Sequence, residues 1–386
     1  MIKRLHVKNF LSLRDIDLEL TQRNVLVGPN MSGKSNLIEC LAFLTRVATS
    51  SLRQAFIDRN GFAEIVWKGS PSEQRISMGL SCQQCTPHEP PTNYQYEISI
   101  LGSQAGFVTI EKEIIVAEKE GRRFTLAELA DGRGTIKHLD GREISTTTGA
   151  PNASALEMSI PGWQGMEVKN FISSWRFYDL IPTLMKSVNA AVEQKFLTKT
   201  GDNFSSWMMT LNTKYPEEFR RLKQAASDAL PGLIEILSPP TQFATTFLLT
   251  KETHLSTPVN IWRMADGELA FLGLLSLILA PAQLSAPLVC IEGPENHLHP
   301  RLMETLVEVW SQAQSEWGAD SSQVIITTHS PQVVDRMKLE DLVVLERSEG
   351  RTRCTRPSSK SHLRELLEKE EAGLGDLWYS GALGGV

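Results

Sequence analysis

The chain has 386 residues, of which 41% are hydrophobic and 22% are charged. These values are typical of a folded globular protein with one large domain or two to three ordinary ones, and they exclude a disordered chain, a fibrous repeat and a small disulfide-stapled scaffold. Lys and Arg number 39 against 45 Asp and Glu, which gives a formal net charge of -6. The chain as a whole is therefore no polycation that binds nucleic acid indiscriminately.

The cysteines form an odd and scattered set: Cys40, Cys82, Cys85, Cys290 and Cys354. Together with the lack of a charged-then-apolar opening segment, they predict free thiols in a reducing cytoplasm. Cys82 and Cys85, followed by His88, have zinc-like spacing, but no second ligand pair follows, so free thiols are favoured over a zinc site. The most apolar run, 269–280, is shorter than the roughly 20 residues of a membrane span. It predicts a buried helix, and we expect no membrane partner.

Hydrophobic alternation at the start of the chain predicts two short strands, over residues 2–7 and 15–20. A short apolar run at 24–27 then ends in a glycine-bearing loop, and the apolar spacing over 36–47 is that of an amphipathic helix. The sequence therefore predicts a strand, a loop and a helix, in that order, for this part of the chain.

The middle of the chain changes character twice. Residues 74–120 fall into short alternating stretches separated by turn residues, which predicts antiparallel hairpins, and the Gly-, Ser- and Pro-rich residues 131–162 predict a loop or lid. Helical spacing returns at 203–214 and 216–229. The final third alternates apolar strands with helices, the pattern of a sheet covered on its faces.

A phosphate-binding motif lies between the first predicted helix and the strand before it. Residues 28–35, GPNMSGKS, fit the pattern G-x-x-x-x-G-K-[ST]. In such a loop, backbone N–H groups converge on the phosphates, Lys34 places its ammonium on the β and γ phosphates, and the Ser35 hydroxyl ligates magnesium. We assign nucleotide binding to Gly28, Pro29, Asn30, Met31, Ser32, Gly33, Lys34, Ser35 and Asn36.

The chain resembles a known family near both ends. The opening NFLSLRDIDLEL, followed by NVLVGPNMSGKSNLIECLAFL, is similar to the N-terminal lobe of ABC-type ATPase heads of the RecF and SMC kind. Residues 291–300, IEGPENHLHP, resemble the Walker B strand and D-loop of these heads, and 327–331, TTHSP, resemble the switch-histidine segment. Residues 264–268, MADGE, resemble the signature motif, and the closing GLGDLWYSGALGG is like that of compact stand-alone bacterial members of this RecF/SMC-like AAA family.

The resemblance implies an α/β fold, a P-loop NTPase of the ABC-type head class with two lobes and a small helical subdomain. We expect the N-terminal lobe over 1–180, the helical subdomain over 181–240 and the C-terminal lobe over 241–386. ATP and Mg²⁺ are the implied cofactors, with the metal held by Ser35 and Glu292. A carboxylate at the end of a buried strand suits that role on physical grounds as well.

The resemblance also assigns the remaining site residues. His329 would contact the γ phosphate, and the signature would grip the γ phosphate of the opposite subunit through Ala265, Asp266, Gly267 and Glu268. Two positions depart from the family pattern. Gly293 stands where the family usually has the glutamate that orients the attacking water, and Ala265 stands where the signature often has a serine. We therefore expect ATP binding with slow turnover, and Glu295, or Glu292 in a shifted geometry, is the candidate to act on the water instead.

We expect two heads to close on ATP as a dimer or higher oligomer that acts as a nucleotide-gated switch. The chain has no long heptad run for a tethering arm. By resemblance, the favoured role is the sensor or regulator ATPase of a bacterial anti-phage or anti-plasmid defence system, working with a separate effector, a nuclease or toxin. A RecF-like repair or recombination ATPase and a non-hydrolysing, ATP-locked scaffold stay open as alternatives.

Contact with DNA is also left open by the sequence. A loose scatter of basic residues surrounds the predicted turns: Arg122, Arg123, Arg133, Lys137 and Arg142. Such residues would touch nucleic acid in a paired state or simply be solvated hairpin tips, and the second interpretation is favoured.

Overall fold

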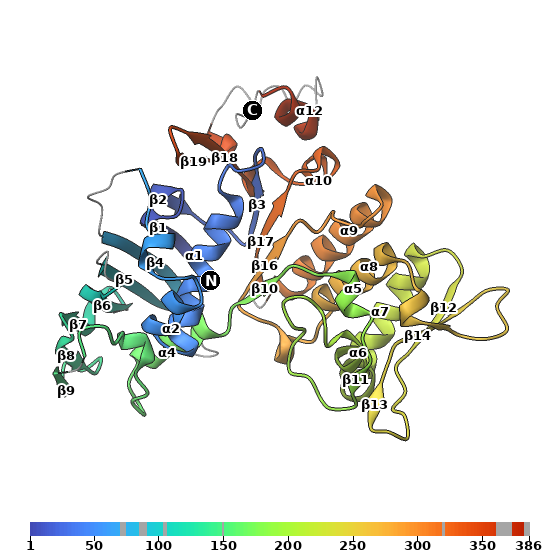
Figure 1. The fold of residues 1–386 in the computed structure, drawn as a ribbon, viewed down its shortest axis with the longest axis horizontal. Coiled ribbons are helices and arrows are strands. Elements are labelled where there is room, and N and C mark those ends of the chain that lie inside the picture. The colour runs from blue at the N-terminus through green and yellow to red at the C-terminus, as the bar shows by residue number, and fades with distance from the viewer. Residues whose placement is uncertain are drawn as a thin grey trace. The chain divides into compact units, whose positions relative to one another are not determined.

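The computed structural model describes residues 1–69, 75–84, 91–102, 106–148, 150–318, 321–359 and 373–381, which form two compact units. The first unit contains the chain up to Trp175 and the segment that begins at Glu340. The second contains Arg176–Leu339 and helix α12 (Leu374–Tyr379). Both units combine helices with strands (Figure 1).

The first unit is built on an eight-stranded antiparallel sheet with the order β2-β1-β4-β5-β6-β7-β8-β9. Its strands are β1 (Ile2–Phe10), β2 (Leu13–Glu19), β4 (Arg75–Gln84), β5 (Thr92–Gly102), β6 (Val108–Lys119), β7 (Arg122–Ala130), β8 (Arg133–Lys137) and β9 (Glu143–Thr148). The predicted N-terminal strands and the hairpins within 74–120 are therefore confirmed. Alternate residues of β5 are buried and exposed, as expected for a sheet with one solvated face.

Helices of the first unit cover the buried side of this sheet with aromatic and aliphatic side chains. They are α1 (Lys34–Thr49), α2 (Leu52–Ile57), α3 (Phe62–Ile65) and α4 (Gly165–Ser173). A chain of ring contacts runs from Phe10 on β1 through Phe43 and Phe56 to Phe62, with centroids 5.7, 5.1 and 5.8 Å apart. Such edge and tilted ring contacts add to the hydrophobic stabilisation of the core.

The expected loop over 131–162 is wrong for much of its length, because β8 and β9 lie within it and pair with one another. The polar composition hid a hairpin at the edge of the sheet, where Ile136 is the fully buried member of β8. Ser154 and Ala155, later in the same segment, form hydrogen bonds with the buried Glu113 of β6. Its carboxylate accepts hydrogen bonds from Tyr96 Oη (2.8 Å), Ser154 Oγ (2.5 Å) and Ala155 N (2.7 Å).

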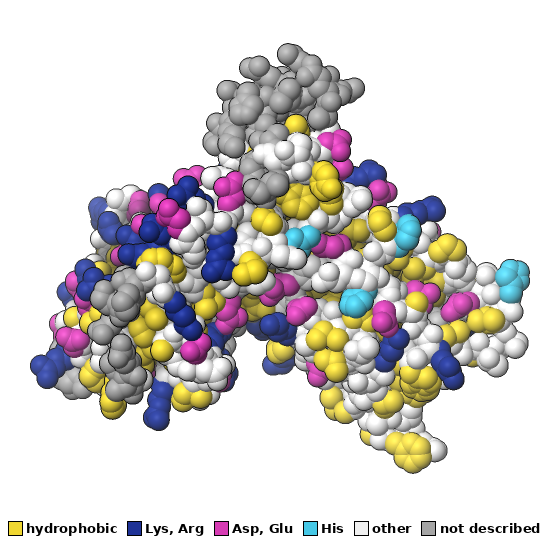
Figure 2. Space-filling view, turned by 45° about the horizontal axis from the view of Figure 1, so that its top comes forward, with side chains coloured by type: hydrophobic (Ala, Val, Ile, Leu, Met, Phe, Trp, Pro, Cys, Tyr) yellow, Lys and Arg dark blue, Asp and Glu magenta, His cyan; other side chains and the backbone are white. Residues whose placement is uncertain are grey.

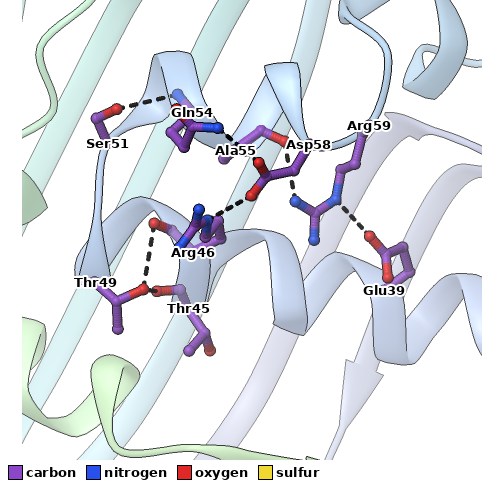
Figure 3. A network of polar contacts seen from close by, with 9 residues as sticks. All are labelled: Glu39, Thr45, Arg46, Thr49, Ser51, Gln54, Ala55, Asp58 and Arg59. Carbon is purple, nitrogen blue, oxygen red and sulfur yellow. Dashed lines mark hydrogen bonds and ion pairs between the residues drawn. The ribbon is translucent and has the colours of Figure 1, made fainter. Parts of the chain in front are cut away.

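A polar network holds the exposed sides of α1 and α2 together (Figure 3). Arg59 forms an ion pair with Glu39 of α1 and donates to the Ala55 carbonyl at 3.0 Å. Arg46 of α1 pairs with Asp58 at 2.5 Å. The helix α1 that opens at the phosphate loop is thereby braced along its length by contacts within the first unit.

Three further strands of the first unit carry the phosphate loop and its surroundings. They are β3 (Arg23–Val27), β18 (Leu342–Ser348) and β19 (Arg351–Thr355). Strand β18 runs parallel to β3 and antiparallel to β19. Segments more than 300 residues apart in the sequence thus meet directly beneath the loop.

The second unit contains the parallel strands β10 (Arg176–Tyr178), β16 (Leu288–Glu292) and β17 (Gln323–Thr328), with β16 in the middle. The near-continuous apolar runs of β16 and β17 are those of strands buried on both faces. Its helices include α5 (Pro182–Met185), α6 (Phe204–Lys214), α7 (Pro216–Ala229), α8 (Asp266–Ile278), α9 (Pro300–Trp317) and α10 (Pro331–Asp335). The helices predicted from the spacing at 203–214, 216–229 and after 269 are confirmed.

Short strands lie at the periphery of the second unit: β11 (Asn189–Ala190) with β13 (Thr245–Thr246), and β12 (Leu233–Leu237) with β14 (Leu249–Glu252) and β15 (Val259–Asn260). Hydrophobic side chains reach the surface of this unit (Figure 2), and Phe243 is 76% exposed. Among the described residues, no helix combines the length and apolar character needed to cross a membrane.

Candidate functional site

The phosphate loop connects β3 to α1 in the first unit, in the order that the sequence predicts. Gly28 and Gly33 have φ values of 156° and 108°, and Met31 between them has a φ of 67°. A Cβ atom on Gly28 would overlap the Leu345 carbonyl of β18, and one on Gly33 would overlap the Thr352 hydroxyl of β19. Both glycines are therefore required by close approach of the backbone as well as by its conformation.

Lys34 is the first residue of α1, and its side chain is buried against the loop. Its Nζ donates to the carbonyls of Gly28 at 2.8 Å and Pro29 at 3.0 Å and lies 3.5 Å from Ser32 Oγ. The first turn of α1 holds no acidic residue. A buried ammonium at a helix N-terminus with no nearby helix carboxylate is an arrangement that attracts phosphate. Ser35, next in the helix, is exposed.

Two hydroxyl residues that sequence reasoning missed hold this loop from outside. Thr352 Oγ1 on β19 donates to the Ser32 carbonyl at 2.8 Å and contacts Ser12 Oγ at 2.6 Å. Asn36 Nδ2 in turn donates to Ser12 Oγ at 2.7 Å. Ser12 lies in the turn between β1 and β2, inside the stretch that carries the family resemblance, whereas nothing in the sequence around Thr352 indicates this contact.

A cavity of about 410 Å³ opens beside the loop within the first unit. Ser12 and Asn36 line it on the side of the loop, and Trp67 and Arg347 line it further out. The Trp67 ring is buried. The guanidinium carbons of Arg14 and Arg351 lie 4.8 and 5.6 Å from the centroid of this ring. The cavity thus reaches Asn36, the residue after the phosphate loop, and its charged lining includes Lys68 and Arg347 as well as Glu64.

The predicted acidic and histidine residues lie together in the second unit, at the carboxyl ends of β16 and β17. Glu292 is the last residue of β16 and pairs in register with Thr327 of β17. Gly293 follows with a φ of 51°, and its N–H donates to both the carbonyl and the hydroxyl of Thr327 at 3.1 Å. A Cβ atom on Gly293 would lie 2.5 Å from Asn296 Nδ2.

Glu295 directs its carboxylate at the end of β17. Its Oε1 accepts from Thr328 Oγ1 at 2.9 Å and from the backbone N–H of His329 at 2.6 Å. Its Oε2 is buried and has no hydrogen-bond partner among the described residues. His329 is exposed. Two of the predicted catalytic residues are therefore joined directly, through a side chain and a backbone group.

The predicted signature residues form the start of α8. Ala265 precedes the helix in extended conformation and offers no side-chain cap, while Glu268 Oε2 accepts from the Ala265 N–H at 3.0 Å. Asp266 forms an ion pair with Lys186 at 2.6 Å, and this hydrogen-bonded partner lowers the pKa of the carboxyl. Gly267 lies against the backbone of His297.

The residues present suit a magnesium nucleotide better than a protein-bound metal cluster. The loop offers an ammonium, backbone N–H groups at the start of α1 and the Ser35 hydroxyl, which are the kinds of group that hold a phosphate and its metal ion. In the described part of the chain, no group of three or more His, Cys, Asp or Glu is arranged to hold a metal. Burial raises the pKa of the Cys82 thiol to about 12, and Cys85 and His88 lie outside the described residues.

Comparisons with known proteins agree with this picture. Residues 23–335 match the family model described as "AAA domain, putative AbiEii toxin, Type IV TA system". The chain is 22% identical over 381 residues to the OLD nuclease of Thermus scotoductus (strain ATCC 700910 / SA-01), covering 89% of this chain. It spans 61% of the length of that curated relative.

Solved structures show the same fold at low sequence identity. An Smc head bound to the C-terminal winged-helix domain of ScpA aligns with a TM-score of 0.58 and 14% identity, covering 92% of this chain and 97% of that one. An Smc head with an extended coiled coil, bound to the C-terminal domain of ScpA derived from Pyrococcus furiosus, aligns with a TM-score of 0.54 and 12% identity, covering 96% and 99%. The expected fold class, an α/β P-loop ATPase head of the ABC type, is thereby confirmed. With the family model covering most of its length, the chain belongs to the family described as AAA domain, putative AbiEii toxin, Type IV TA system.

Proposed function

We propose that this protein binds MgATP in the phosphate loop, that two copies close around the nucleotide, and that the closed state serves as a switch. The observation that carries the proposal is the buried Lys34 ammonium in a glycine-built loop at the N-terminus of α1. Ser35 and Glu292 would hold the magnesium ion, which neutralises charge on the phosphates during transfer.

A dimer follows from the sandwich arrangement of the family. The signature residues at the start of α8 are presented on the second unit, and in this arrangement they reach the nucleotide of the opposite copy. The N-terminus of α8 provides backbone donors and a favourable dipole for a γ phosphate, and the two carboxylates of its first turn are engaged, Asp266 with Lys186 and Glu268 with the Ala265 N–H. Ala265 contributes no hydroxyl to this contact, so the signature of this chain offers one donor fewer than a serine-bearing one.

Turnover is proposed to be slow. Gly293 has no side chain with which to orient water, and Oε1 of the nearby Glu295 already accepts two hydrogen bonds. Loss of a water-orienting group lowers the rate by orders of magnitude, whereas nucleotide binding depends on the loop and the metal.

For the biological role we propose a cytoplasmic regulator ATPase of a defence system that acts with a separate nuclease or toxin. The family description names a putative toxin of a toxin–antitoxin system, and the matched curated relative is named a nuclease. A RecF-like repair ATPase is the alternative. The basic hairpin residues give it little support, because Arg142 already pairs with Asp140 at 2.7 Å and Arg123 donates to Gln95 at 2.9 Å.

The deciding measurement is steady-state ATP turnover with Mg²⁺, together with the nucleotide-dependent mass in solution. We expect wild-type protein to bind ATP and to dimerise with it, and Lys34→Ala to do neither. We expect wild-type turnover to be close to that of the Lys34→Ala blank, and we expect turnover to be higher in Gly293→Glu. Since Gly293 has a φ of 51° and Asn296 nearby, Gly293→Ala is the matched control, with the same strain and no carboxylate.

Fast wild-type turnover that Gly293→Glu does not increase would overturn the slow-turnover part of the proposal. Failure of wild-type protein to bind ATP would overturn the nucleotide switch itself. Binding to duplex DNA whose logarithmic affinity falls linearly with the logarithm of salt concentration would favour the repair role over the defence role.

A further inference from the structure

The segment after β16 is folded so that one carboxylate faces the neighbouring strand. Consecutive backbone hydrogen bonds, Asn296 N to Gly293 O (2.8 Å) and Leu298 N to Glu295 O (3.0 Å), turn the chain tightly there. These turns bring the Glu295 side chain to the carboxyl end of β17. We call residues 293–299 the D-loop segment, after the family motif they resemble.

Glu295 Oε1 accepts hydrogen bonds from two consecutive residues at the end of β17. It accepts from the Thr328 hydroxyl and from the His329 N–H. Thr328 Oγ1 also accepts from the N–H of Ser330 at 3.0 Å. The main chain of His329 is therefore held by Glu295 directly and through Thr328, while its imidazole is exposed. Charge-assisted hydrogen bonds of this kind are stronger than neutral ones and restrict orientation.

The second carboxylate oxygen argues against direct chemistry on water. Oε2 of Glu295 is buried, and no described residue forms a hydrogen bond with it. A general base must present a free lone pair within hydrogen-bond reach of the proton that it removes. In Glu295 one oxygen already accepts two hydrogen bonds and the other is buried, which favours a structural part for this carboxylate.

We propose that Glu295 is a positioning residue, which sets the orientation of His329 toward the γ phosphate by holding its backbone N–H. The inference rests on the proposed nucleotide switch and gives the D-loop segment a defined part in it. A change in the D-loop segment is transmitted to the histidine through one hydrogen-bonded oxygen. This role differs from the sequence-based prediction that Glu295 substitutes for the missing glutamate, and the variants below distinguish the two.

The chemistry of glutamine makes the proposal testable. Glu295→Gln keeps a carbonyl oxygen that accepts from Thr328 and His329 but has no basic carboxylate. Glu295→Ala removes both hydrogen bonds. A positioning role therefore predicts that the His329 orientation and the turnover of Glu295→Gln resemble those of wild type, whereas those of Glu295→Ala do not. If Glu295 were a general base, both variants would lose turnover equally. Thr328→Val, which removes one donor, should give an intermediate result.

The readout is the imidazole NMR signal of His329, assigned with a His329→Gln variant, before and after addition of MgATP. We expect its chemical shift without nucleotide to be the same in wild type and Glu295→Gln and to move in Glu295→Ala. When MgATP is added, the His329 chemical shift should change by the same amount in wild type and Glu295→Gln and by a smaller amount in Glu295→Ala. Where turnover exceeds the Lys34→Ala blank, Ala should lower kcat by about tenfold to 100-fold with little change in KM.

Equal effects of Gln and Ala, or an unchanged His329 signal in Ala, would overturn the proposal. Thermal unfolding of each variant shows whether it is folded, and Glu295→Gln with Thr328→Val still provides the comparison if Ala does not fold. An absence of ATP binding in wild type would overturn the proposed switch, yet the signal without nucleotide would still report on the contact between Glu295 and His329. The two failures are thus distinguishable.

Discussion

The carbonyl oxygen of His297 lies 2.8 Å from the position that a Cβ atom on Gly267 would occupy. Gly267 is in the first turn of α8, and His297, with a φ of 72°, is in the D-loop segment. The signature helix and the D-loop segment therefore touch backbone to backbone within the second unit. Only glycine allows this approach, because a backbone carbonyl cannot rotate away as a side chain does.

Gly267→Ala is predicted to lower the free energy of unfolding by about 1–2 kcal/mol, because overpacking against the backbone outweighs the gain in helix propensity. Gly273→Ala in the same helix is the matched control. The neighbours of its added Cβ are the ends of the flexible Leu180 and Met185 side chains. Denaturant unfolding of both variants makes the comparison, and equal stability of the two would contradict the prediction.

Ala265→Ser is predicted to stabilise the protein. Ala265 is the N-cap of α8, with φ -67° and ψ 148°, and has no side-chain acceptor for the free N–H groups of the first turn. A serine at such a position typically adds about 0.5–2 kcal/mol. Ala265→Val, which adds bulk without an acceptor, should bring no gain. We also expect the serine variant to dimerise at a lower ATP concentration, because its hydroxyl is an additional donor.

Glu113 is predicted to make stability depend on pH. Burial raises the pKa of its carboxyl to about 7 from an ordinary 4.5. Between these values the native state keeps a proton that the unfolded state has released, so the unfolding free energy is highest below the lower value and falls as the pH rises toward 7. The fall due to this group is at most roughly 3 kcal/mol.

The measurement is the difference in unfolding free energy between wild type and Glu113→Gln at several pH values from 4.5 to 7.5. The difference should change with pH in that window, because glutamine does not titrate. Glu118→Gln, at an exposed position on the same strand, is the control and should give a constant difference. A constant difference for Glu113→Gln as well would refute the buried-carboxyl explanation.

Thr352→Val is predicted to weaken nucleotide binding although Thr352 lies far from the loop in sequence. The change keeps the shape of the side chain but removes its hydrogen bonds to the Ser32 carbonyl and the Ser12 hydroxyl. At about 1 kcal/mol for each such bond, affinity for a fluorescent ATP analogue should fall roughly fivefold to 30-fold. Thr355→Val, exposed on the same strand, should leave the affinity unchanged.

Local patterns in the sequence were sufficient to predict most elements. Alternation predicted the central hairpins, and apolar spacing predicted α1, α6, α7 and α8, because these signals depend on periods of two and 3.6 residues within one segment. The hairpin of β8 and β9 was missed. Its residues are largely polar, and what makes it a strand pair is the neighbouring sheet edge rather than its own hydrophobicity.

The phosphate loop could also be predicted, since its glycines, lysine and serine are adjacent in the chain and their chemistry follows from their order. The residues that hold the loop from outside could not be predicted. Ser12 and Thr352 are 340 residues apart in the sequence and form a hydrogen bond in the structure. No motif around either residue indicates this contact.

The sequence by itself was sufficient to identify the phosphate loop and to nominate the other candidate site residues: the acidic strand end, the signature and the histidine. Only the tertiary structure decided what the neighbouring groups do. It placed Oε1 of Glu295 on the His329 backbone, and it placed Gly267 against His297. The physical reason is that hydrogen bonds and close approaches between distant segments depend on the register of strands and the path of turns, which composition and spacing along one segment do not specify.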